Sequence, residues 1–252
     1  MKIAIVTGAS SGMGRETIIQ MADRFGGLEE IWAIARRADR MEELQTQVPV
    51  ALRVIPLDLA DPASWQELKA RLEEIRPEVK ILVNSAGYGK IGTVGSASLA
   101  DETGMVGVNC QALCAVTNLV LPYMPDNSRI IQYASSAAFL PQPRFAIYAA
   151  TKAFVLSYSR ALNVELKPRK IYVTAVCPGP VRTEFFDIAE TKASIPVYKK
   201  LAMADPKKVV ALALRDSMMG KDISVYGPIM KAFRVLAKIL PHRLILNVKW
   251  YQ

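Results

Sequence analysis

A tyrosine and a lysine four residues apart, Tyr148 and Lys152, could together move a proton. In a helix this spacing places both side chains on one face, about one turn apart. An ammonium beside a phenol favours the phenolate, which lowers the phenol pKa from its usual value of ~10. Such a phenol can give a proton to a carbonyl oxygen or take one from an alcohol. The spacing indicates a general acid/base pair, although nine tyrosines are enough to give one match by chance.

Two adjacent serines, Ser135 and Ser136, close an apolar run upstream of this pair. A hydroxyl at the end of a strand can hold a substrate oxygen and stabilise the charge that develops on it. Serines at a strand end are otherwise common turn residues. The pair therefore adds a candidate oxygen-binding group without establishing one.

A glycine-rich segment follows the first apolar run and opens a helical pattern. It reads Thr7-Gly8-Ala9-Ser10-Ser11-Gly12-Met13-Gly14. Glycines let the backbone turn tightly and approach a pyrophosphate, whose charge suits the amides and the positive end of the helix dipole. Between a strand and a helix, this spacing favours dinucleotide binding over an ordinary tight turn. The same residues match a hydrolase nucleophile elbow, but Met1 and Lys2 alone precede the strand and cannot build the earlier strands that an elbow needs.

Two arginines, Arg36 and Arg37, follow the second apolar run. A carboxylate at this position would bind the adenosine ribose of NAD, whereas an arginine would pair with the 2′-phosphate of NADP. The sequence therefore predicts NADP (NADPH) as the cofactor and makes NAD less favoured. We expect Arg36 to make the contact; the alternative is two arginines on a solvated turn.

Alternating strands and helices must position these residues. The predicted strands are 3–7, 31–35, 52–57, 81–83, 129–134 and 171–177, and the predicted helices are 14–25, 40–47, 62–75, 103–121 and 147–166. Several strands are apolar on both faces, as in a parallel sheet covered by helices on each side. The alternation predicts one α/β domain with a doubly wound parallel sheet, a three-layer αβα Rossmann fold. In such sheets ligands bind beyond the carboxyl ends of the strands, where the motifs above lie.

Taken in order, these motifs resemble those of the short-chain dehydrogenase/reductase family over residues 1 to about 227. The resemblance rests on Thr7-Gly8, Gly12-Met13-Gly14, Asp58-Leu59, Asn84-Ser85-Ala86-Gly87, Asn109, Ser136, Tyr148, Lys152 and Pro178-Gly179-Pro180-Val181-Arg182-Thr183. The family implies hydride transfer between NAD(P) and a carbonyl/alcohol pair. It also implies homodimers or homotetramers, formed through the helices at 103–121 and 147–166.

The resemblance assigns roles to individual residues. It implies that Tyr148 is the general acid/base, that Lys152 lowers its pKa and holds the nicotinamide ribose, that Ser136 polarises the carbonyl, and that Asn109 anchors a proton-relaying water. The implied cofactor-binding residues, several of which also appear above, are Gly8, Ser10, Ser11, Gly12, Met13, Gly14, Arg36, Arg37, Asp58, Leu59, Asn84, Ser85, Ala86, Gly87, Tyr148, Lys152, Pro178, Gly179, Val181 and Thr183. Within that set, Asp58 would contact adenine and Thr183 the carboxamide.

Three positions depart from the family pattern. Ser85 stands where a second asparagine is more usual, and Phe139 stands where a glycine usually follows the catalytic serine by three. Tyr148 follows Ser136 by twelve positions, which is one fewer than the family spacing between the catalytic serine and tyrosine. Ser135 would restore that spacing, whereas Ser136 fits the local motif better, and we favour Ser136.

Composition narrows the class of protein. The chain has 252 residues, of which 51% are hydrophobic, as expected of a packed domain and not of a disordered chain. One histidine and three scattered cysteines offer no metal-binding cluster, and the odd cysteine count suggests a reducing, cytoplasmic compartment. Residues 103–125 lack charge over a length that could cross a bilayer, but their amides and prolines favour a buried helix in a soluble protein.

The net charge of +9 lies at the C-terminal end, where residues 191–252 hold twelve basic and three acidic residues. After a catalytic domain at 1–227, an extension at 228–252 carries Lys231, Arg234 and Lys238 on one helical face and apolar residues on much of the other. A helix packed on its own domain or a second subunit, a lid over the substrate and peripheral contact with a membrane all fit this pattern. Nucleic acid is a less favoured partner, because the basic residues lie among aliphatic ones.

Together the residues and the resemblance predict an NADP(H)-dependent oxidoreductase acting on a small hydrophobic ketone or secondary alcohol. A hydroxysteroid or bile acid is the first choice of substrate, and a 3-oxoacyl thioester is the alternative. A dinucleotide-binding sensor without turnover is a third possibility, and it would not need Tyr148 or Lys152.

Overall fold

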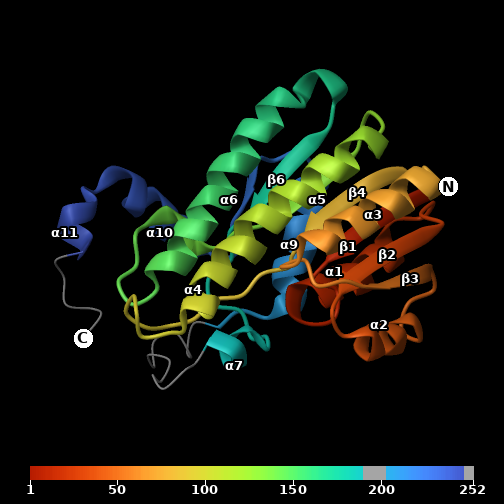
Figure 1. Cartoon of the computed structure of the whole chain (residues 1–252). Helices are drawn as coiled ribbons and strands as arrows, with labels where there is room; N and C mark the ends of the chain where they lie inside the picture. Colours follow the sequence, from red (N-terminus) through yellow and green to blue (C-terminus); the bar gives the residue numbers. More distant parts are fainter. Residues whose placement is uncertain (190–202, 247–252) are drawn as a thin grey trace.

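A computed structural model describes residues 1–189 and 203–246, and its sheet confirms the predicted α/β class (Figure 1). Seven parallel strands lie in the order β3-β2-β1-β4-β5-β6-β7. The strands are β1 (Lys2–Thr7), β2 (Glu30–Ala35), β3 (Ala51–Pro56), β4 (Glu78–Asn84), β5 (Arg129–Tyr133), β6 (Tyr172–Val176) and β7 (Ile223–Ser224). The order reverses between β1 and β4, where a doubly wound sheet binds its ligand.

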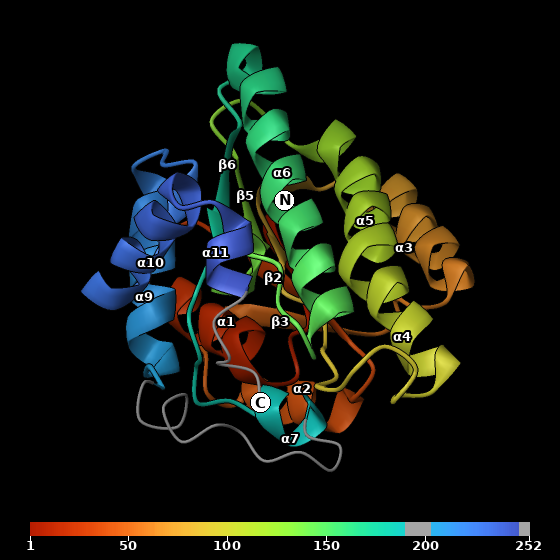
Figure 2. The same cartoon turned by 90° about the vertical axis from the view of Figure 1, so that its left-hand side faces the viewer.

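Helices cover both faces of the sheet (Figure 2). The α-helices of the described residues are α1 (Gly12–Arg24), α2 (Ala38–Gln45), α3 (Pro62–Ile75), α4 (Leu99–Val106), α5 (Leu113–Val120), α6 (Ala146–Glu165), α7 (Phe185–Ala189), α9 (Pro206–Met218), α10 (Pro228–Ile239) and α11 (His242–Leu246), of which α7, α10 and α11 lie away from the sheet. Short helical turns are η1 (Gly107–Ala112), η2 (Leu121–Tyr123), η3 (Ser136–Phe139) and η4 (Lys167–Arg169).

Successive side chains of β1 point to opposite faces of the sheet, so this one strand contributes to two hydrophobic cores. Ile3 and Ile5 face one side and pack with residues of α3, α5 and α6. Ala4 and Val6 face the other side and pack with residues of α1, α2 and α9. All four side chains are fully buried, so the apolar pattern on both faces of the strand produces the predicted three layers.

The uncharged segment expected as one helix is a continuous helical run from Leu99 to Tyr123, interrupted by the wider turns of η1. By length and composition it is the one run in the described ranges that could cross a membrane. In this structure Leu113, Val116 and Val120 are buried, and the last two pack in the core beneath α3 and α6, as predicted for a core helix. The wider turns contain Asn109, one of the predicted site residues.

The predicted C-terminal extension, residues 228–252, contains α10 and α11. Pro228 occupies the first turn of α10, and the helix ends before Pro241. Residues 247–252, which complete the predicted extension, lie outside the described residues, as do residues 190–202 of the basic C-terminal part.

Candidate active site

The glycine loop between β1 and α1 crosses the end of β4 at very short range. Gly8 has φ +68°, and a Cβ there would lie 2.8 Å from the backbone nitrogen of Ala86. A Cβ on Gly14 would lie 2.3 Å from the carbonyl oxygen of Gly8. Thr7 holds the two strand ends together, because its Oγ1 accepts hydrogen bonds from the amides of Ser85 and Ala86 at 3.1 and 3.2 Å. The loop therefore needs glycine for its own path and for close approach of a ligand.

A cavity of about 520 Å³ opens beyond these strand ends. Thirteen of the predicted cofactor-binding residues line it: Gly8, Ser10, Ser11, Gly12, Met13, Arg36, Arg37, Asp58, Leu59, Ser85, Ala86, Gly87 and Thr183. Its size lies in the usual range for a ligand pocket. A glycine-rich loop at the start of α1, facing a cavity of this size, fits a dinucleotide pyrophosphate.

Other predicted cofactor residues lie away from that cavity wall. Asn84 is buried and its amide donates to Thr117 Oγ1 at 3.0 Å, so it ties β4 to α5. Gly179 packs against the side chain of Met230, and Val181 forms a bridge with Ala204. Pro178 accepts a hydrogen bond through its carbonyl oxygen from the amide of Ser136 at 2.8 Å. The prediction that these residues touch the cofactor gains no support from their positions, which are structural.

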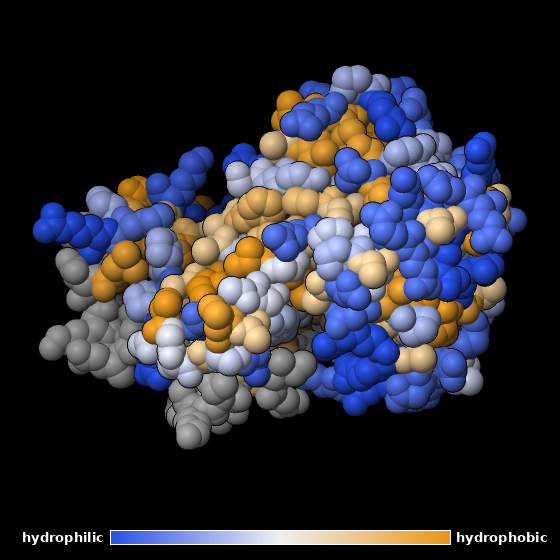
Figure 3. Space-filling model, in the orientation of Figure 1, coloured by the Kyte–Doolittle hydropathy of each residue, from blue (hydrophilic) through white to orange (hydrophobic). Residues whose placement is uncertain are grey.

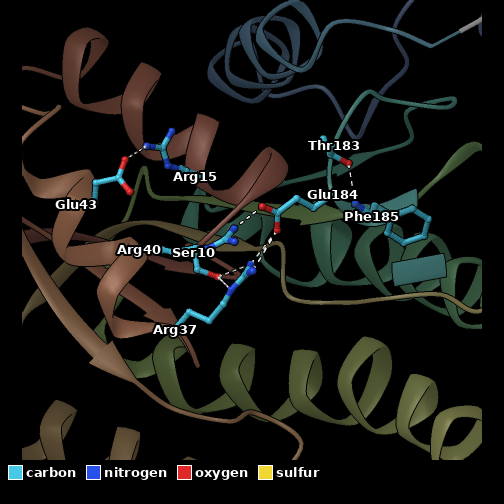
Figure 4. Close-up of polar contacts among 8 residues, drawn as sticks. All are labelled: Ser10, Arg15, Arg37, Arg40, Glu43, Thr183, Glu184 and Phe185. Atoms are coloured by element: carbon cyan, nitrogen blue, oxygen red, sulfur yellow. Dashed lines mark hydrogen bonds and ion pairs between the residues drawn. The ribbon is translucent and has the colours of Figure 1, made fainter. Parts of the chain in front are cut away.

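Both predicted arginines, Arg36 and Arg37, line the basic end of the cavity, and Figure 4 shows the contacts that hold Arg37. Arg36 lines the cavity and is exposed, whereas Arg37 donates from Nε to Ser10 Oγ at 3.3 Å and pairs with Glu184 at 3.2 Å. Arg40, which the sequence analysis did not consider, also pairs with Glu184. The arginine held beside the glycine loop is thus Arg37 and not Arg36, because the chain turns at Arg37 to begin α2.

Glu184 joins two rims of the cavity that lie 147 residues apart in the chain, through its contact with Arg37. Hydrogen bonds first from Arg40 and then from Arg37 hold the pKa of Glu184 below its usual value, so the carboxylate is charged at neutral pH. Each of these three side chains is about two-fifths exposed, so solvent screens the pairing. A negative group therefore occupies the basic subsite in this structure.

Tyr148 and Lys152 share one face of α6, as predicted, and both are buried. Lys152 Nζ lies 5.7 Å from the centre of the Tyr148 ring and donates to the carbonyl oxygen of Tyr133 at 2.8 Å. Burial disfavours the charged form of each group: it lowers the pKa of Lys152 to about 8 and raises the pKa of Tyr148 to about 12. The predicted lowering of the Tyr148 pKa is therefore wrong for this structure, in which burial is the largest influence and only the Ser135 side chain opposes it.

The serine beside Tyr148 is Ser135. Its side chain lies near enough to the phenol to lower the Tyr148 pKa against the larger effect of burial, and its Oγ accepts a hydrogen bond from the amide of Ala137 at 3.1 Å. Ser136 begins η3, and its amide points to Pro178. The preference for Ser136 is therefore corrected: the backbone is extended at Ser135 and turns at the next residue, which places the first hydroxyl of the pair at the site.

Asn109 is fully buried behind the pair. Its Oδ1 accepts from the amide of Tyr88 at 3.0 Å, and its Nδ2 donates to the carbonyl oxygen of Tyr88 at 2.9 Å and to Thr151 Oγ1 at 3.0 Å. A Cβ on Gly87 would lie 2.7 Å from Asn109 Oδ1 and 3.4 Å from Lys152 Nζ. Asn109 thus lies close to Lys152, and the hydrogen bonds described here fix the Gly87–Tyr88 backbone beside the cavity.

Two phenylalanines that sequence reasoning missed cover Tyr148. The ring of Phe145 stacks on it at 4.3 Å between centroids, and that of Phe185 lies tilted at 5.3 Å. Phe185 follows Glu184, and its amide donates to Thr183 Oγ1 at 3.4 Å (Figure 4). Of the two, only Phe145 could have been found from the sequence, because it lies three residues before Tyr148 and therefore about one helical turn away. The segment that carries Glu184 at the basic end also covers the phenol.

Within the described ranges, no group of three or more His, Cys, Asp or Glu side chains is placed to hold a metal ion. The polar groups gathered at the site are a phenol, an ammonium, a hydroxyl and an amide. This set can exchange protons with a carbonyl or alcohol oxygen beside a dinucleotide-sized cavity.

Comparison with known proteins shows which family of sequences the chain resembles. A model described as short chain dehydrogenase matches residues 2–193. The probable short-chain type dehydrogenase/reductase VdlC of Helicobacter pylori is 29% identical over 199 residues, which cover 77% of this chain and 71% of that protein. A very-long-chain 3-oxoacyl-CoA reductase of Pyrenophora tritici-repentis is 29% identical over 218 residues, 82% of this chain. The chain spans only 62% of that relative's length.

Solved structures give the same result. A short-chain dehydrogenase from Sphingobium yanoikuyae, in complex with NADPH, is similar with a TM-score of 0.79 and 26% identity, over 100% of this chain and 98% of that one. A 3-ketoacyl-(acyl-carrier-protein) reductase from Brucella melitensis, complexed with NADH, has a TM-score of 0.76 and 25% identity, over 89% and 95% of the two chains. These two structural relatives thus hold different nicotinamide cofactors.

Proposed function

The chain belongs to the short-chain dehydrogenase/reductase family of NAD(P)-binding oxidoreductases, and from this premise we propose that it reduces a ketone on an apolar substrate with NADPH. The observation that carries the proposal is the position of the Tyr148 phenol, beside the Ser135 hydroxyl and above Lys152. One hydroxyl to give a proton, one to hold the oxygen and one ammonium to stabilise the phenolate meet the needs of carbonyl reduction.

The proposed reaction divides between cofactor and protein. When bound, the reduced nicotinamide supplies the hydride that goes to the carbonyl carbon. Tyr148 gives its phenolic proton to the carbonyl oxygen, which Ser135 holds by a hydrogen bond, and the ketone becomes a secondary alcohol. Lys152 stabilises the phenolate that remains. The phenol is protonated at neutral pH, which is the form that carbonyl reduction needs.

The preference for NADPH over NADH rests on the basic end of the cavity. Arg37 and Arg40 approach each other across Glu184, and Arg37 also contacts Ser10 of the glycine loop. A 2′-phosphate offers the same type of charge-assisted contact that the Glu184 carboxylate makes here. We propose that the phosphate takes the place of that carboxylate, with Arg36 at the exposed edge.

The substrate we propose is a 3-oxoacyl thioester. Relatives carrying that activity in their names support this choice, and the hydroxysteroid or bile acid expected first has no counterpart among the relatives described above. The phenylalanines over Tyr148 add an apolar surface beside the reacting oxygen. We also propose a homodimer or homotetramer formed through α5 and α6, where Phe154 and Val164 are exposed.

A substrate panel tests the proposal. Consumption of NADPH and NADH should be followed with 3-oxoacyl thioesters, steroid ketones and small ketones. We expect turnover of the thioesters with NADPH, at about tenfold higher kcat/KM than with NADH, a ratio typical of one charge-assisted phosphate contact. Turnover of steroid ketones without turnover of 3-oxoacyl thioesters would show that the substrate is a steroid and not a thioester. Tight NADPH binding without turnover of any ketone would favour a dinucleotide sensor.

A further inference from the structure

Helix α10 is attached to the domain by one narrow face. A Cβ on Gly179 would lie 2.7 Å from Met230 Sδ, so the methionine packs directly on the chain after β6. The ring of Phe233 lies 6.3 Å from that of Phe139 in η3, and Ala237 is buried. These contacts fix the position of α10, and the described residues leave much of its remaining circumference exposed.

The remaining surface of α10 is strongly apolar. Ile229 and Ile239 are 71% and 70% exposed, and Val235, Leu236 and Leu240 are also exposed. Figure 3 shows hydrophobic and hydrophilic side chains next to each other on the part of the surface where α10 and α11 lie in Figure 1. Single exposed aliphatic residues are ordinary, but five within twelve consecutive positions form a patch that water solvates poorly.

The charges around this patch have one sign. Lys231, Arg234 and Lys238 are exposed along the same helix, and Arg243 follows in α11. The sequence from Pro228 to Leu246 contains no aspartate or glutamate. Two copies of the helix meeting face to face would bring like charges together, which disfavours a second copy of this chain as the partner. An anionic surface with an apolar interior satisfies both features.

We propose that α10 docks this protein on an anionic lipid bilayer, with its exposed aliphatic side chains in the interfacial region and its lysines and arginine among the phosphate groups. Because α10 packs on η3, directly after Ser135, the docked helix lies beside the proposed substrate side of the active site. An apolar substrate could then pass from the bilayer to the site. This last point alone rests on the proposed function; the docking itself does not.

Flotation with lipid vesicles tests the docking on the full chain. Vesicles of phosphatidylcholine, with and without phosphatidylglycerol, are mixed with the protein at low and high salt. We expect flotation with the anionic vesicles at low salt and its loss at high salt, because screening weakens contacts with exposed charges. Equal flotation with both vesicle types, or with neither, would overturn the proposal.

Matched variants locate the surface. Replacing two basic residues, Lys231→Gln with Lys238→Gln, should lower vesicle affinity about tenfold. The same charge change in η4, Lys167→Gln with Lys170→Gln, should leave it within about twofold. Ile239→Ser should weaken binding about tenfold, whereas Val94→Ser, at an equally exposed position in the loop before α4, should not. Equal losses in the α10 variants and their controls would overturn the assignment to α10.

Two further readouts separate the outcomes. Sedimentation without lipid shows whether Ile239→Ser dissolves an oligomer; if it does, and the wild type does not float, a second copy covers the patch and the lipid proposal is wrong. Turnover of a water-soluble ketone should be unchanged in the α10 variants. Vesicle binding by a chain that turns over no ketone would sustain the docking while the proposed reaction fails.

Discussion

The two ends of the candidate cofactor site differ in how far their charged and titratable groups are exposed to solvent. At the basic end, Arg37, Arg40 and Glu184 are half exposed and paired, and solvent screens them. At the other end, Tyr148 and Lys152 are buried, and both pKa values are moved toward the neutral form. Exposed ion pairs adjust affinity by small amounts, whereas buried titratable groups decide which protonation state exists. We therefore expect changes at the basic end to alter cofactor choice and changes at the buried end to alter the chemical step.

Lys152→Met should give the largest contrast between activity and stability. Without the ammonium, the phenolate left after proton transfer is unstabilised, and we expect kcat to fall about a thousandfold. The folded pKa of about 8 lies below the usual 10.5, so burial of the charge destabilises the wild type below pH 8, and stability rises as the pH increases toward 10.5. The variant should be more stable by about 2 kcal/mol at pH 7 and lose this pH dependence.

Thermal unfolding of both proteins between pH 7 and 10.5 measures that prediction. Retention of the wild-type pH dependence in Lys152→Met would show that another group titrates in this range. Lys170→Met, on the exposed η4 turn, is the control and should change neither activity nor the pH profile.

Ser135→Ala and Ser136→Ala separate two hydroxyls that are adjacent in sequence. Because the Ser135 hydroxyl contacts the phenol and would hold the carbonyl oxygen, we expect kcat to fall about a hundredfold in Ser135→Ala. Ser136→Ala should retain activity within about threefold. Steady-state rates at saturating NADPH distinguish them, and a larger loss in Ser136→Ala would restore the assignment made from the sequence motif.

Arg37→Ala should weaken NADPH binding about tenfold while leaving NADH binding nearly unchanged. Arg36→Ala is the control at the neighbouring position. We expect it to change NADPH affinity by about twofold only, because the Arg36 side chain is exposed and takes no part in the Arg37–Glu184 ion pair. Quenching of tryptophan fluorescence by each cofactor gives the dissociation constants. If both cofactors weaken equally, Arg37 supports the fold of the loop and does not select the phosphate.

Glu184→Gln should have the smallest effect and the opposite sign. Removing the carboxylate that competes for Arg37 and Arg40 should tighten NADPH binding about threefold, with no change for NADH. Raising the salt concentration should reduce the difference between variant and wild type. Weaker NADPH binding in this variant would mean that Glu184 assists the phosphate and does not compete with it.

Local patterns predicted the parts of the site that depend on short stretches of chain. The glycine loop, the strand ends and the shared face of Tyr148 and Lys152 follow from spacing and strand–helix alternation, and the structure contains them. The fold class followed for the same reason, since β1, β2, β5 and β6 each carry a run of buried, mostly apolar positions within five or six residues.

Features that depend on distant or buried contacts could not be predicted. The partner of Arg37 is Glu184, far along the chain, and nothing in either segment indicates the other. The raised pKa of Tyr148 depends on Phe145 and Phe185 packing over it, which spacing cannot reveal. The choice between the two serines depends on whether the backbone turns after Ser135 or after Ser136. Sequence patterns do not locate a turn to a single residue.

Single-turnover reduction by Tyr148→Phe, followed as NADPH oxidation with the best substrate of the panel, tests the central claim most directly. Removing the hydroxyl removes the proton donor but keeps the ring between Phe145 and Phe185. The account predicts that hydride transfer slows by about a thousandfold or more while NADPH affinity stays within about twofold. A variant that transfers hydride at the wild-type rate would contradict it, and the phenol would then not be the proton donor.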